Sequence, residues 1–366
     1  MSNTAKSDLD IFPAEIKLSI VKSMDLRSIR NFMLTCTKHR DLVLENQTSL
    51  CVDMARRYIV PPAGPIFDSV AVKTNGFWTR GIIQPGAFKF IAELELRDRR
   101  IDRITSYFPN LVYLVTLSGF GHTTKEIRSR MIPLVRRTLW HCDAISDIAA
   151  RVLPVPRDVD TSGMDERERW AHEALCNDME AVHNEDPYRF LAARHLQIGY
   201  VQALADLDLA MLLLVSAVLG SNYARVHEAA HHLGAHVGQR AKERITVFEE
   251  TALRHGSWFL WDEMCGDAEM RRHAKHMIEM GCRELVEFED GNPFAPSGLK
   301  MTLMKECRAR FLNHLRKGRN VRPLKVINTT WDVVKRAIGQ PTEDQVKEGT
   351  RAVESLSEEM ARMHIH

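Results

Sequence analysis

The stretch that decides the fold occupies residues 8–43 and reads DLDIFPAEIKLSIVKSMDLRSIRNFMLTCTKHRDLV. Apolar residues recur at every fourth position in its first half: Ile16, Ile20 and Met24. This spacing is typical of one face of an α-helix. Pro13 suits the first position of that helix, because its missing N–H would have no partner there. Asp25 is a good cap for a second helix, so the stretch predicts three short helices.

The order of residue types in this stretch is also informative. It starts with an apolar residue, a proline, and a glutamate followed by another apolar residue: Phe12, Pro13, Glu15 and Ile16. An aspartate and a second apolar set follow the first helix, and then a small residue, a basic region and a closing leucine: Asp25, Ile29, Phe32, Leu34, Cys36, Lys38, His39 and Leu42. In this order and register the stretch resembles an F-box over residues 8–51. It departs from the family at Phe12, Leu26 and His39, where Leu, Pro and Trp are common.

The resemblance implies a function through partners rather than catalysis. The chain is similar to a fungal-type F-box protein with a divergent C-terminal region. Such a protein would bind a Skp-type adaptor of a cullin-based ubiquitin ligase, and its remaining residues would hold a protein target. The resemblance implies adaptor contacts by a set of F-box residues: Phe12, Pro13, Ile16, Ile20, Met24, Ile29, Phe32, Cys36 and Leu42. It implies no catalytic residue and no cofactor.

A physical argument leads to the same need for a partner. Three short helices of about 40 residues bury too little apolar area to be stable alone. Their apolar stripe must therefore pack on the rest of the chain, or on another protein that receives apolar anchors at helical spacing.

The rest of the chain is predicted to be mainly helical. The cluster VPPAGPI at residues 60–66 marks a boundary, and residues 67–366 form the second region, with a possible break near 152–164. Short apolar runs at 91–96 and 111–117 predict extended segments within residues 67–120. The second run is similar to a leucine-rich-repeat strand, although two copies do not make an array. The predicted fold class is thus mainly α, with a three-helix start and a short extended segment.

Composition favours an intracellular globular protein. Lys and Arg number 50 and Asp and Glu number 48, so the net charge of +2 predicts no large surface for nucleic acid. The seven cysteines include no CxxC pair, which is typical of reduced cysteines in a protein core. No apolar leader is visible, and the longest apolar run, 209–220, is too short to span a membrane and predicts a buried helix. We expect a cytoplasmic or nuclear protein without a membrane partner.

One other motif predicts a different class of function, a zinc metallopeptidase. His227, Glu228 and His231 form an HExxH sequence, which on a helix places two imidazoles on one face with a glutamate as general base. Glu250 follows at a spacing known for a third zinc ligand in one aminopeptidase family. Arg225 and the total of 16 histidines weaken this alternative, because the first places charge near the site and the second makes a chance match common.

The sequence does not indicate the target, its phosphorylation or the oligomeric state. The basic segment at 305–325 predicts a solvated helix face.

Overall fold

The computed structural model describes residues 11–58, 70–74, 78–106, 111–120, 124–152, 187–229, 237–289, 303–316 and 326–339. Within these ranges the regular structure is helical apart from one two-stranded sheet, so the mainly α prediction is confirmed. The predicted boundary at 60–66 lies outside the described residues.

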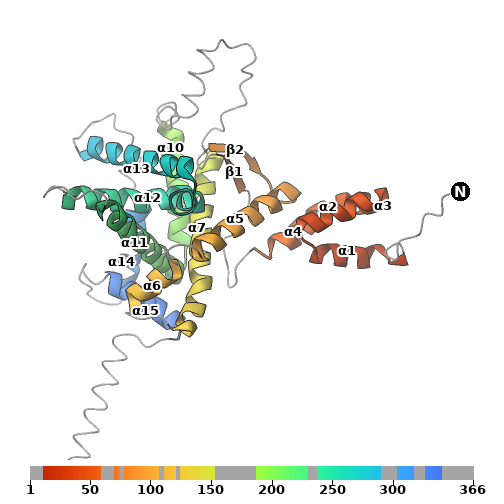
Figure 1. Cartoon of the computed structure of the whole chain (residues 1–366), viewed down its shortest axis with the longest axis horizontal. Helices are drawn as coiled ribbons and strands as arrows, with labels where there is room; N and C mark the ends of the chain where they lie inside the picture. Colours follow the sequence, from red (N-terminus) through yellow and green to blue (C-terminus); the bar gives the residue numbers. More distant parts are fainter. Residues whose placement is uncertain are drawn as a thin grey trace, which may run out of the picture.

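The N-terminal residues form an arm that projects from a larger helical body (Figure 1). The arm contains four short helices: α1 (Ala14–Ser23), α2 (Leu26–Thr35), α3 (Thr37–Glu45) and α4 (Gln47–Ala55). Pro13 precedes α1 as expected, and the side chain of Asp25 accepts a hydrogen bond from the Ser28 N–H at 2.6 Å to cap α2. The three predicted short helices are therefore present, and α4 continues the arm toward the body.

The extended structure is confined to a hairpin. Strands β1 (Val70–Thr74) and β2 (Trp78–Ile83) pair antiparallel, with Val70 opposite Ile83. The predicted extended runs at 91–96 and 111–117 are wrong, because they lie within helices α5 (Phe88–Ser106) and α6 (Leu111–Phe120). The buried apolar residues of α5 follow a helical spacing: Ile91, Leu94, Ile101 and Ile104. Short apolar runs do not distinguish a strand from a buried helix.

The body is built around α7 (Lys125–Val152), which packs against α5, α6 and three later helices. The remaining helices follow in order: α10 (Pro187–Ala203), α11 (Asp206–Ala229), α12 (Val237–Met264), α13 (Ala268–Glu289), α14 (Leu303–Arg316) and α15 (Val326–Ala337). The possible break near 152–164 begins at the last residue of α7 and otherwise lies outside the described residues.

The apolar run at 209–220 lies in α11, and the side chains at 209–215 are buried. By length and composition alone, Asp206–Tyr223 of α11 is apolar enough to cross a membrane, but 67% of this window is buried inside the fold. The prediction that this segment is too short to span a membrane is therefore wrong as to its length, whereas the burial of its side chains confirms the prediction of a buried helix.

Candidate functional site

The arm buries apolar side chains that are continuous with the core of the body. The inward faces of its helices bury a compact set of side chains: Val21, Ile29, Phe32, Val43, Leu50 and Met54. His39, at the position where F-box sequences favour Trp, is also buried and stacks on Phe32 with 4.2 Å between ring centroids. Its Nδ1 lies 2.8 Å from the Thr35 hydroxyl, so the imidazole has a polar partner within this core.

The structure divides the predicted adaptor-contacting residues into an exposed group and a buried group. Phe12 and Ile16 are 45% and 47% exposed, and Pro13 beside them is exposed as well. Four residues are half-buried: Ile20, Met24, Cys36 and Leu42. Ile29 and Phe32 lie in the core of the arm, so in this conformation they support the surface rather than form it.

Further apolar side chains extend the exposed surface of the arm. The large apolar side chains exposed on residues 11–58 are Ile11, Phe12, Ile16, Leu34, Leu44 and Val52. Among the residues outside the arm whose side chains the structure describes, four large apolar side chains are exposed: Leu96, Tyr113, Ile132 and Leu196. Exposed apolar residues that concentrate in one small part of a chain indicate an interaction surface. The sequence reasoning missed Ile11, Leu44 and Val52 as site residues, because helical spacing alone did not show which face the body covers.

The arm is braced against the body rather than linked to it by loose chain. Helix α4 packs on α5, and the Gln47 side-chain amide donates to the Gly86 carbonyl at 3.0 Å. Gly86 has a φ of 95°, and a Cβ there would lie 3.1 Å from the Thr48 methyl carbon, so this close approach favours glycine. Within the arm, Lys22 and Asp53 join α1 to α4 through an ion pair of 2.6 Å.

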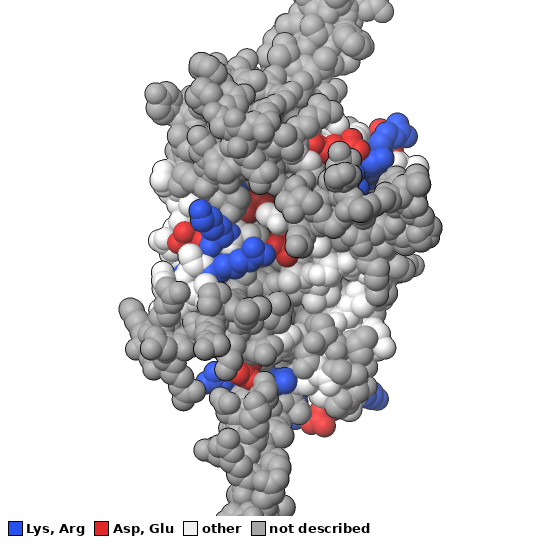
Figure 2. Space-filling view, turned by 90° about the vertical axis from the view of Figure 1, so that its left-hand side faces the viewer, with Lys and Arg blue, Asp and Glu red and all other residues white. Residues whose placement is uncertain are grey.

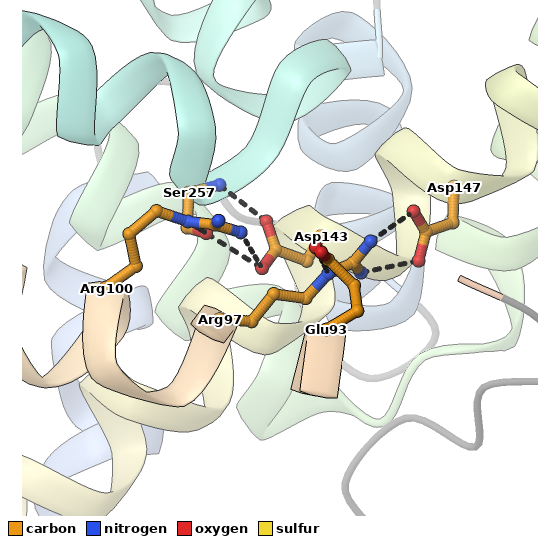
Figure 3. Close-up of polar contacts among 6 residues, drawn as sticks. All are labelled: Glu93, Arg97, Arg100, Asp143, Asp147 and Ser257. Carbon is orange, nitrogen blue, oxygen red and sulfur yellow. Dashed lines mark hydrogen bonds and ion pairs between the residues drawn. The ribbon is translucent and has the colours of Figure 1, made fainter. Parts of the chain in front are cut away.

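A second polar feature, which the sequence did not reveal, is a buried charge network among α5, α7 and α12 (Figure 3). Arg97 on α5 forms a two-pronged pair with Asp147 on α7, with N–O distances of 2.6 and 2.9 Å. Its Nε also donates to Glu93 at 2.9 Å. Burial alone would lower the pKa of Arg97, but the adjacent Asp147 and Glu93 raise it overall. Arg97 is therefore a permanent cation that joins two core helices.

Asp143 on α7 organises the other half of this network. Its carboxylate accepts hydrogen bonds from the Ser257 N–H at 2.6 Å and from the Ser257 hydroxyl at 2.8 Å. These bonds cap the segment of α12 that starts after the backbone break at Gly256, where φ is 67°. Arg100 donates from Nε to the Ser257 hydroxyl at 3.1 Å (Figure 3). Burial lowers the pKa of Arg100 to about 10, and Asp143 offsets this effect only in part. The network holds α5, α7 and α12 together.

The alternative zinc ligands are not assembled into a described site. His227 and Glu228 belong to the last turn of α11, their side chains are not described, and His231 lies outside the described residues. Among described residues, no group of three or more His, Cys, Asp or Glu side chains has the arrangement of a metal site.

Glu250 has a different set of partners in the structure. Its carboxylate accepts the Leu303 and Met304 N–H groups at 3.0 Å each, and Arg254 donates to it at 2.8 Å. Burial would raise the pKa of Glu250, but Arg254, Arg194 and the two amides lower it overall. Its oxygens are thus occupied by the first turn of α14, a structural role that competes with metal binding.

The basic segment at 305–325 is only partly a solvated face. Among its described residues, Arg308 pairs with Glu249 at 2.6 Å, and Arg310 donates to the Val201 and Leu204 carbonyls. Figure 2 shows one face of the body, where the described Lys and Arg side chains lie beside Asp and Glu and form no broad patch of one sign. This mixture agrees with the net charge of +2.

Comparison with known proteins found no matching family model, no similar curated protein and no similar solved structure. Any functional assignment therefore rests on the residues and geometry described above.

Proposed function

We propose that this chain is the substrate receptor of a Skp–cullin–F-box type ubiquitin ligase. The arm, residues 11–58, would dock on a Skp-type adaptor, and the helical body would hold a target protein. The observation that carries the proposal is the exposed apolar edge formed by Phe12 and Ile16 on an arm that buries its other apolar residues, among them Val21, Ile29 and Phe32.

The exposed edge is available for a partner because the chain leaves nearly half of the surface of Phe12 and Ile16 uncovered. Val21, on another face of α1, already packs into the core with Ile29 and Val43. Covering a side chain of the size of Phe12 or Ile16 contributes about 1.5–3 kcal/mol. Phe12 precedes α1 and Ile16 lies in its first turn, so together they offer two neighbouring apolar anchors to a groove on a partner.

The brace between arm and body is consistent with a receptor that works by proximity. A receptor accelerates transfer to a target by raising its effective concentration near the ligase, without contributing a chemical group. The contact between α4 and α5 and the bond from Gln47 to Gly86 fix where the body stands relative to the arm. A body held in this way presents its target in a defined position.

The test is to map adaptor binding onto the arm. The full chain, a Phe12→Ala/Ile16→Ala variant and an Ile132→Ala/Leu196→Ala control would be titrated with a purified Skp-type adaptor. The control removes exposed apolar residues from α7 and α10 of the body. We expect the arm variant to lose at least about 2 kcal/mol of binding free energy, the scale of an interface hot spot. Equal affinity of all three proteins would reject this docking surface.

Unfolding measurements separate lost binding from lost structure. Because Phe12 and Ile16 are about half exposed, the arm variant should keep the urea midpoint of the wild type to within a small shift. A large loss of stability would show instead that these residues pack within the chain.

A further inference from the structure

Five buried polar atoms of three residues gather where α5 meets the last segment of α12. They are Nη1 and Nη2 of Arg100, Nε1 of Trp258, and both carboxylate oxygens of Asp262. None of the five has a hydrogen-bond partner among the residues that the structure describes. The only ion pair of Arg100 among the described contacts, a loose approach of 3.9 Å to Asp143, is longer than a hydrogen bond.

These three side chains are neighbours. The Arg100 guanidinium carbon lies 4.2 Å from the centroid of the Trp258 ring. Trp258 and Asp262 are four residues apart on α12 and therefore share one helix face. Asp262 is fully buried. The charge of Arg100 lowers the pKa of Asp262, although the described ion pairs include none between the two side chains.

Leaving all five atoms unsatisfied is energetically untenable. A buried donor or acceptor without a partner carries the full cost of its desolvation. Five such atoms together would rival the whole stability of a typical domain. Buried polar groups in folded proteins are accordingly paired with protein atoms or with ordered water.

We propose that this junction is a buried water site in which water bridges Arg100 and Trp258 to Asp262. The hydrogen-bonding chemistry of these three side chains decides which molecule can bind between them. This molecule must accept hydrogen bonds from the guanidinium and the indole N–H, and it must share a hydrogen bond with the carboxyl group. A cation would meet the charge of Arg100, and an anion would meet the carboxylate of Asp143. A small neutral molecule that both donates and accepts, namely water, satisfies every group.

The backbone break at Gly256 places this site in a distinct part of α12. Residues 257–264 start a new helical segment after Gly256, and Asp143 caps that segment through Ser257. Because the five polar atoms are buried, exchange of the bridging water with solvent requires the surrounding side chains to open. The water should consequently exchange slowly enough to behave as part of the structure.

Oxygen-17 magnetic relaxation dispersion of the full chain tests the site, because it counts slowly exchanging internal waters. Asp262→Leu removes both acceptors and fills space with apolar atoms, whereas Asp262→Asn retains hydrogen-bonding capacity. Glu269→Leu, at an exposed acid of α13, serves as the control. We expect the Leu variant at position 262 to lose at least one slowly exchanging water, and the Asn variant and the control to keep the wild-type number.

An unchanged number in a folded Asp262→Leu variant would overturn the proposal. If that variant does not fold, a high-resolution crystal structure of the wild-type chain decides the question. Water between the Arg100 guanidinium and the Asp262 carboxyl group would support the site. A direct Arg100–Asp262 ion pair, or another side chain filling the space between them, would refute it.

Discussion

Replacing Gly256 by alanine would test how α12 is held in the core. Gly256 has a φ of 67° and a ψ of −152°, a backbone region that is almost restricted to glycine and costs another residue about 1–3 kcal/mol. A Cβ at this position would lie 2.4 Å from Asp143 Oδ1 and 3.0 Å from Asp143 Cα. Because one of these contacts is with the backbone of α7, a side-chain rotation alone cannot relieve the overlap.

The second part of the cost comes from the cap. Asp143 would have to move away from Ser257, and the segment after the break would lose its two hydrogen bonds to this carboxylate. Loss of a helix cap costs about 0.5–2 kcal/mol. Together with the backbone strain, we expect Gly256→Ala to lower the unfolding free energy by about 2–5 kcal/mol.

Urea unfolding followed by circular dichroism provides the assay, and Gly199→Ala provides the control. Gly199 is exposed within α10, and a Cβ there would meet no atom within 4 Å. The control should gain up to about 1 kcal/mol, because alanine is the better helix former. If Gly256→Ala were as stable as the wild type, the described break and its cap by Asp143 would be wrong.

Two further predictions concern the buried charges of the body. Burial raises the pKa of Asp262 from 3.8 to about 7, so the folded chain holds this proton more tightly than the unfolded chain and loses stability as the pH rises from about 4 to 7. Asp262→Asn should therefore raise the urea midpoint above that of the wild type by more at pH 8 than at pH 5. An equal rise at both pH values would contradict the raised pKa of Asp262. Arg97→Met leaves Asp147 and Glu93 buried without their cation and should cost about 3–5 kcal/mol in urea unfolding, whereas wild-type stability would show that the pairing is dispensable.

The arm could be predicted largely from the sequence because local signals agree there. Pro13 and Asp25 mark the starts of two helices, and apolar spacing identifies their faces. The spacing could not tell which apolar residues would be covered. Phe12 and Ile29 were both predicted to contact the adaptor, yet the first is exposed and the second is buried.

The polar interior could not be predicted, because a buried charge and a solvated charge look alike in a sequence. Arg97 falls on the same helical face as the buried Ile101 and Ile104, but only the structure brings Asp147 within reach, 50 residues away. Glu250 is a second buried charge whose role could not be predicted, since its spacing from the HExxH motif predicted a zinc ligand. The structure instead places its carboxylate at the first turn of α14.

The most direct test of the central claim is a calorimetric titration of the full wild-type chain with a purified Skp-type adaptor. The proposed receptor role predicts saturable binding of one adaptor per chain. It also predicts a negative heat-capacity change, because apolar surface including Phe12 and Ile16 becomes buried. A well-folded chain that gives no binding heat at several temperatures, and no complex in size-exclusion chromatography, would contradict the account and make the exposed edge of the arm a surface for some other partner.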